Sequence, residues 1–161
     1  MTISRVLRVC EVPTSAAMHE LGKELGGMLR AGDLVILDGP LGAGKTTLTR
    51  GIGDALAVRG PVTSPTFVLA RTHPSVVSGP PLVHVDAYRL TNAMELDDLD
   101  IDYPHAVVVV EWGAGMLDGV AESWMVVAIE RRRGESSLDC DADEPRAVTI
   151  TGFGPRWVES A

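Results

Sequence analysis

Residues 39–47 read GPLGAGKTT and come shortly after the apolar segment 34–37, which reads LVIL. A short apolar run between turn residues is typical of a buried central strand. Beyond the glycines, apolar residues recur at helical spacing, which predicts a helix whose buried face carries Leu48, Ile52, Ala55 and Leu56. Gly51 and Gly53 are each expected to weaken this helix by about 1 kcal/mol. The glycine-rich stretch is therefore predicted to join the end of a strand to the start of a helix.

The same stretch matches the pattern G-x-x-x-x-G-K-[ST], a P-loop. Glycine lets the backbone wrap closely around a phosphate, and amide N–H groups at a helix N-terminus point at its oxygens. Lys45 supplies a positive charge for the β- and γ-phosphates, and the Thr46 hydroxyl is placed to bind magnesium. The residues predicted to bind nucleotide here are Gly39, Leu41, Gly42, Ala43, Gly44, Lys45, Thr46 and Thr47. Because the chain has only two lysines, Lys23 and Lys45, a plain glycine-rich turn followed by a chance lysine is the weaker interpretation.

Two acidic residues stand at the ends of further apolar segments. Asp86 follows residues 82–85, and Glu111 follows residues 107–110. A nucleotide in a P-loop needs a carboxylate at the end of a neighbouring strand to hold the metal or its water. Asp86 and Glu111 are therefore predicted, with Lys45, to be catalytic, and with Thr46 to bind the metal. A solvent-facing acid is the alternative for each alone, and the sequence leaves open which of the two touches the ion.

Three further residues near these motifs are candidates. Trp112 offers a flat surface for a purine, although a tryptophan at a strand end more often packs in a core. Thr66 lies in the loop after the predicted helix, where nucleotide switches keep a threonine that senses the γ-phosphate. Arg89 suits either phosphate charge or a partner, and equally an ordinary surface position. The histidines show no metal-ligand spacing and are assigned no chemistry: His19, His73, His84 and His105.

The N-terminal part of the chain predicts a strand followed by a helix. Residues 5–12 favour an edge strand. The helix is expected to start at Thr14 or Ser15 and to end at Gly32 and Asp33. Its predicted buried face consists of Met18, Leu21, Leu25, Met28 and Leu29.

The remainder predicts mostly strands. Residues 66–71 and 82–86 are expected to form a hairpin with a long loop. Further strands are predicted at residues 107–110, 125–129 and 147–151, and a short acidic helix at residues 93–99. The expected fold is a single P-loop NTPase-like α/β domain over residues 1–161, in which helices flank a mixed sheet. Residues 131–161 are the part least defined by motifs.

Composition narrows the classes of function. The formal net charge is −8, so the molecule as a whole repels a nucleic-acid backbone. The two cysteines, Cys10 and Cys140, lie too far apart in sequence for a zinc motif and make no disulfide framework. Purely apolar runs such as residues 106–110 are far too short to cross a bilayer. We expect a cytoplasmic protein with no membrane partner.

Four motifs, in their order along the chain, resemble a bacterial family, the TsaE ATPases of tRNA threonylcarbamoyladenosine biosynthesis. They are GPLGAGKTT at residues 39–47, TSPTF at 63–67, HVDAYRL at 84–90 and VVVEWG at 108–113. The resemblance covers residues 14–113 and extends more weakly over residues 146–157. It departs from the usual pattern at Pro40, where an acidic residue is common, in DAYRL in place of DLYRL, and in the absence of a tyrosine from residues 73–81. None of these departures removes a predicted phosphate or metal ligand.

The resemblance implies a fold, a cofactor and partners. It implies a P-loop domain that binds ATP and Mg²⁺ through Lys45 and Thr46, with Glu111 as the magnesium-associated acid. It also implies that Asp86 is required for hydrolysis and that Trp112 stacks on adenine. The family's ATPase associates with a TsaD-like transferase and a TsaB-like scaffold, and it meets tRNA indirectly through them.

Other functions share a P-loop. A non-hydrolysing switch would use ATP only to order the segment SPTF at residues 64–67 and so favour one partner complex. A small-metabolite kinase would need an acceptor site, and no such constellation is recognisable. A GTPase is less favoured, because the chain has neither an [NT]-K-x-D nor a D-x-x-G motif. The sequence therefore favours an ATPase that supports tRNA modification.

Overall fold

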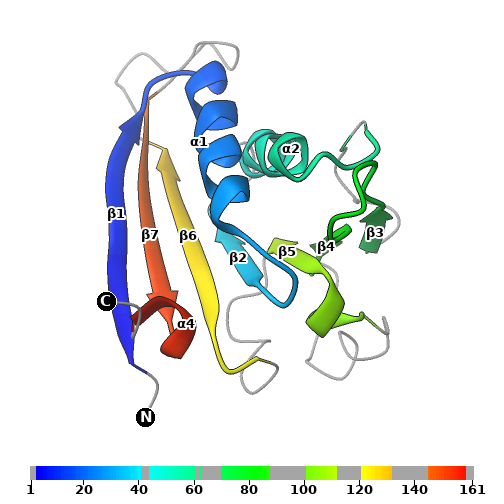
Figure 1. Cartoon of the computed structure of the whole chain (residues 1–161). Helices are drawn as coiled ribbons and strands as arrows, with labels where there is room; N and C mark the ends of the chain where they lie inside the picture. Colours follow the sequence, from blue (N-terminus) through cyan, green and yellow to red (C-terminus); the bar gives the residue numbers. More distant parts are fainter. Residues whose placement is uncertain are drawn as a thin grey trace.

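The computed structural model describes residues 3–40, 44–60, 62, 70–87, 101–111, 121–131 and 145–158. Its strands are β1 (Ser4–Val12), β2 (Leu34–Asp38), β3 (Ala70–His73), β4 (Leu82–Asp86), β5 (Val107–Glu111), β6 (Trp124–Arg131) and β7 (Arg146–Phe153). Its helices are α1 (Ser15–Met28), α2 (Lys45–Leu56), the 3₁₀ helix η1 (Tyr103–His105) and the short α4 (Pro155–Val158). In Figure 1, α1 and α2 lie on the same face of the sheet.

The strands form one mixed sheet in the order β1-β7-β6-β2-β5-β4-β3. The central strands run parallel: β2 pairs with β5 and β6, and β4 pairs with β5. The outer pairs are antiparallel, namely β3 with β4, β6 with β7, and β7 with the edge strand β1. The predicted α/β fold with a mixed sheet and the N-terminal edge strand are confirmed. A hairpin does form, from β3 and β4, but β3 extends to His73, and residues 66–69 of the predicted first strand lie outside the described residues. The predicted helix at residues 93–99 lies outside the described residues.

The central strands are apolar on both faces because both faces are buried. On one face, which we call the helical face, Val35 and Leu37 of β2 pack with apolar residues of α1 and α2. On the opposite face, Leu34 and Ile36 pack with valines of β4 and β5. This two-sided burial explains why the strand next to the P-loop reads LVIL and does not alternate with polar residues.

The helix α1 starts as predicted but ends earlier. The Thr14 hydroxyl accepts a hydrogen bond from the Ala17 amide at 3.1 Å and caps the start. The predicted end at Gly32 and Asp33 is wrong, because Leu29 already has extended dihedrals of φ −84° and ψ 147°. Met28 is 47% exposed and does not belong to the buried face, whereas Leu29 turns away from the helix and is buried.

The two helices on the helical face pack backbone against backbone. A Cβ on Gly22 of α1 would overlap the Leu48 carbonyl oxygen and would lie 3.0 Å from Cα of Gly51 in α2. A Cβ on Gly51 would in turn overlap the His19 carbonyl oxygen. Gly51, which weakens α2 as an isolated helix, thus lets the two helices approach this closely, whereas Gly53 faces Val62 and Val58. Ala55, predicted on the buried face of α2, is exposed.

A buried ion pair fastens the C-terminal helix to the start of β2. Asp33 is 6% exposed and accepts hydrogen bonds from Nε and Nη2 of Arg156 at 3.2 and 3.3 Å. The same guanidinium lies 4.2 Å from the ring centre of Trp157. The short helix α4 is therefore part of the folded domain. None of the helices in the described part of the chain is both long and apolar enough to span a membrane.

Candidate functional site

The predicted P-loop lies between the end of β2 and the start of α2. Gly44 is the N-cap of α2, with φ +110°, a left-handed conformation that favours glycine. No side chain caps this helix start among the described residues. Amide N–H groups at the start of a helix are suited to bind an oxygen ligand. Three predicted nucleotide-binding residues of the loop, Leu41, Gly42 and Ala43, lie outside the described residues.

Lys45, the first residue of α2, is a buried cation. Its side chain is 5% exposed, and Nζ donates a hydrogen bond to the Gly39 carbonyl oxygen at 2.6 Å. Burial lowers the pKa of Lys45 below its ordinary value of 10.5. The negative charges of Glu111, Asp86 and Asp38 oppose that shift in its pKa. A charge held out of water next to carboxylates is poised for a ligand of high negative charge.

The predicted acids lie on neighbouring strands. Asp86 ends β4 and Glu111 ends β5, and the parallel register places these two residues side by side. Glu111 is also in register with Leu37, one residue before the end of β2. The carboxyl ends of β2, β4 and β5 therefore meet where α2 begins. Glu111 is 5% exposed, and Asp86 is half-buried.

The structure brings a further residue to this cluster that the sequence did not reveal. Nε2 of His84 lies 2.6 Å from Oε2 of Glu111, and the His84 side chain is completely buried. Metal-ligand spacing, the criterion applied to the histidines in the sequence, does not reveal a histidine that hydrogen-bonds a carboxylate. The signal that was available is the i, i+2 spacing of His84 and Asp86, which puts both on one face of β4. The contact to Glu111 depends on the pairing of β4 with β5, which the sequence does not state.

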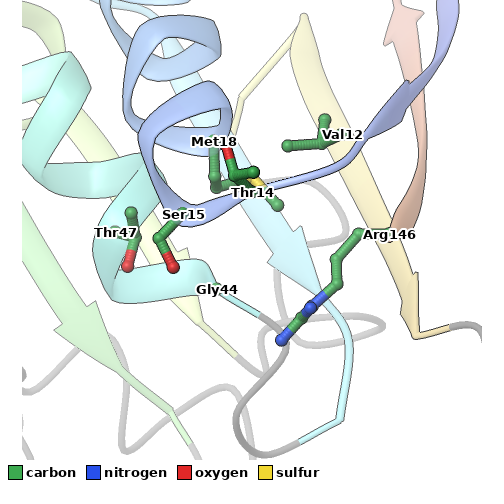
Figure 2. A pocket seen from close by; sticks show the side chains of 7 residues that line it. All are labelled: Val12, Thr14, Ser15, Met18, Gly44, Thr47 and Arg146. Atoms are coloured by element: carbon green, nitrogen blue, oxygen red, sulfur yellow. The ribbon is translucent and has the colours of Figure 1, made fainter. Parts of the chain in front are cut away.

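A hollow beside the start of α2 was also not predicted. It is lined by Val12, Thr14, Ser15, Met18, Gly44, Thr47 and Arg146 (Figure 2). Figure 2 shows Ser15 and Thr47 on adjoining helix starts and Arg146 reaching in from β7. The hydroxyls and the guanidinium give this hollow polar partners next to the P-loop helix. Because three separate segments form it, no local pattern in the sequence indicates it.

The structure describes two of the remaining predicted site residues and leaves three outside the described residues. Thr46 and Thr47 lie half-buried in the first turn of α2, beside Lys45. Thr66 and Trp112 lie outside the described residues, as does Arg89, so their roles stay predictions.

His73 gives the stability a pH dependence that can be measured. It is 5% exposed, and burial lowers its pKa below the ordinary value of 6.5. Below pH 6.5 the unfolded chain binds a proton at residue 73 that the folded chain does not yet bind. The free energy of unfolding is therefore expected to fall with decreasing pH, with a contribution from His73 of at most about 1.4 kcal/mol per pH unit.

Urea denaturation at pH 7.5 and 5.5 checks this expectation. The variant His73→Asn cannot titrate in this range and should lose less stability between the two pH values than the wild type. An equal loss in both proteins would contradict the assignment.

Comparisons with known proteins show what the chain is similar to. The family model described as threonylcarbamoyl adenosine biosynthesis protein TsaE matches residues 12–138. The chain is 57% identical to the tRNA threonylcarbamoyladenosine biosynthesis protein TsaE of Streptomyces coelicolor, over 87% of this chain and 93% of that protein. It is 52% identical to the protein of that name from Mycobacterium tuberculosis, over 69% of this chain and 71% of the relative.

A solved structure supports the fold. The crystal structure of Bacillus subtilis YdiB superposes with a TM-score of 0.69 at 24% sequence identity, covering 98% of this chain and 90% of YdiB. The family match over most of the chain and the high identity to the Streptomyces relative establish that the chain belongs to the TsaE family.

Proposed function

We propose that this chain binds and hydrolyses ATP in support of N6-threonylcarbamoyladenosine formation in tRNA. The observation that carries the proposal is the buried Lys45 at the start of α2, flanked by the carboxyl ends of β4 and β5. The biosynthetic role comes from the names of its relatives, which are tRNA threonylcarbamoyladenosine biosynthesis proteins.

The described residues fit a nucleoside triphosphate with its magnesium ion. The start of α2 has no side-chain cap, and a phosphate group would satisfy those amide donors. Lys45 Nζ would exchange the Gly39 carbonyl for phosphate oxygens. The Thr46 hydroxyl and the carboxylates of Glu111 and Asp86 are hard oxygen ligands of the kind that Mg²⁺ prefers. Bound there, Mg²⁺ would neutralise charge on the β- and γ-phosphates.

The chain's own groups then divide the work of hydrolysis. Lys45 stabilises the negative charge that develops when the bond between the γ-phosphorus and its bridging oxygen breaks. The carboxylate of Asp86 or Glu111 orients the attacking water, or would hold the magnesium ion together with the Thr46 hydroxyl. Both carboxylates stand beside Lys45, because β4 and β5 are adjacent and in register.

The nucleoside has two proposed places. The hollow of Figure 2 adjoins Gly44 and Thr47 and offers hydroxyls and a guanidinium to a ribose or a base. It includes Arg146 of β7, and so lies on the β6 side of β2. Stacking on Trp112 would instead bring the base toward β5, on the other side of β2. A crystal structure with ADP decides between the two.

The proposed partners are a TsaD-like transferase and a TsaB-like scaffold, in the cytoplasm. The net charge of −8 supports tRNA contact through these partners, since this chain repels a phosphate backbone. ATP turnover would then serve a complex whose other members hold the tRNA.

A multiple-turnover assay of tRNA modification tests the proposal. It combines this chain, the two partner proteins, the substrate tRNA and Mg²⁺ with either ATP or a non-hydrolysable analogue. We expect phosphate release and repeated modification with ATP, and no more than one round with the analogue. Equal modification with both nucleotides would favour the non-hydrolysing switch. A phosphorylated small product in place of free phosphate would favour a kinase.

A further inference from the structure

The Glu111 carboxylate contacts a completely buried histidine, His84. Along β4 the side chains alternate, so Leu82, His84 and Asp86 share the helical face. In the neighbouring strand, Glu111 lies on the same face, in register with Asp86. Nε2 of His84 lies 2.6 Å from Oε2 of Glu111, and the two side chains are 0% and 6% exposed. The strand that supplies one carboxylate thus also supplies a hydrogen-bond partner for the other.

The chemistry of this contact fixes the donor. A carboxylate only accepts hydrogen bonds, so the hydrogen lies on Nε2 of His84. One oxygen of Glu111 is then tied to the imidazole. A hydrogen bond to an ionised group is strong and directional, so it restricts rotation of the whole carboxylate. The other oxygen, Oε1, is then restricted to one orientation at the end of β5, and the charge of this carboxylate acts on Lys45.

Packing alone gives no reason for a histidine at this position. On the helical face the residues next to His84, Leu82 along β4 and Val109 across on β5, are buried and apolar, and an apolar side chain would satisfy the same surroundings. Nδ1 of His84 has no hydrogen-bond partner among the described residues. A buried polar atom without a partner destabilises the fold. A histidine that destabilises the fold through Nδ1 is expected where the contact of Nε2 has a function.

We propose that His84 is a positioning residue that orients the Glu111 carboxylate for ATP turnover. This inference rests on the proposed function. His84 touches neither nucleotide nor metal in this assignment, and it acts only through Glu111. It should therefore affect the chemical step much more than nucleotide binding, since Lys45 and the start of α2 are left intact.

Two amide variants at residue 84 differ in reach and make a matched pair. In His84→Gln the amide nitrogen lies about as far along the side chain as Nε2 and can still donate to Glu111. In His84→Asn the amide is one methylene shorter and cannot. At pH 8, we expect His84→Asn to lower kcat about tenfold with KM for ATP changed less than twofold. We expect His84→Gln to stay within about threefold of the wild-type kcat.

A second histidine provides the control for a general effect of burial. His73 is buried on the adjacent strand β3, and within the described part of the chain the histidine that hydrogen-bonds Glu111 is His84 and not His73. His73→Asn should keep kcat within about twofold of the wild type. If it slows turnover as much as His84→Asn, or if His84→Gln is as slow as His84→Asn, the inference is overturned.

A measurement on the nucleotide-free wild type needs no variant to fold and no activity. Spectra of the chain with ¹⁵N-labelled histidine should show the His84 ring with its hydrogen on Nε2, protected from exchange with solvent. A hydrogen on Nδ1 with Nε2 bare would overturn the inference. A wild type that turns over no ATP would overturn it together with the proposed function. An active wild type with an equally active His84→Asn would overturn the inference alone.

Discussion

Replacing Lys45 with alanine is expected to lower ATP turnover about a hundred- to a thousandfold, the usual effect of removing one pre-organised charge-stabilising group. The expectation follows from the surroundings of Lys45. The residue is 5% exposed, and the negative charges of Glu111 and Asp86 act on its ammonium group. In such surroundings a positive charge acts on the transferred phosphate with little screening by water. Phosphate release with saturating Mg²⁺ and partner proteins measures the effect.

The chain contains its own control for this variant. Lys23, the only other lysine, lies on α1 and forms an exposed ion pair with Glu20 at 3.7 Å. Lys23→Ala removes the same charge from the molecule and should leave turnover within about twofold of the wild type. If the two alanine variants are equally active, the P-loop assignment is wrong. Urea denaturation of both variants separates loss of chemistry from loss of fold.

Gly22→Ala is expected to destabilise the fold by about 3 kcal/mol, near the upper end for an overpacked core. The added methyl group would overlap the Leu48 carbonyl oxygen of α2 and lie 3.0 Å from Cα of Gly51. Both obstacles are backbone atoms, so the whole helix must move to relieve the clash. The helices α1 and α2 would separate, and the start of α2 carries Lys45.

Gly27→Ala is the matched control, in the same helix with the opposite expected sign. A Cβ on Gly27 meets nothing within 4 Å, and the residue is exposed. The substitution should therefore stabilise the protein by about 0.5–1 kcal/mol, because alanine favours a helix over glycine. The free energies of unfolding of the two variants, from urea denaturation, are compared with that of the wild type. A shift of the same sign in both would contradict the packing described for Gly22.

Residues close together in the sequence were predicted well. The P-loop residues that the structure describes, Gly39 and residues 44–47, lie between a buried strand and a helix as expected. Asp86 and Glu111 end β4 and β5 as expected. The end of α1 was misplaced because Gly32 does have a positive φ of 96°, but it serves the turn into β2, three residues beyond the extended Leu29.

Residues far apart in the sequence were placed only by the tertiary structure. Gly51 predicts a weakened α2, whereas its contact with Gly22 shows that it permits close packing of two helices. His84 opens the motif HVDAYRL, but it meets Glu111 only because β4 pairs with β5 in one register. The hollow beside α2 exists because β1, α1 and β7 converge there.

The sequence by itself determined the family, the fold class and the chemical groups at the P-loop, because each follows from side chains a few residues apart. The tertiary structure alone decided which strands are neighbours, and hence that a buried histidine contacts Glu111, one of the two acids predicted to act with Lys45. The reason is physical. Backbone dihedrals and spacing act over one turn or one strand, whereas strand pairing and helix contact are fixed only when distant apolar faces are buried together.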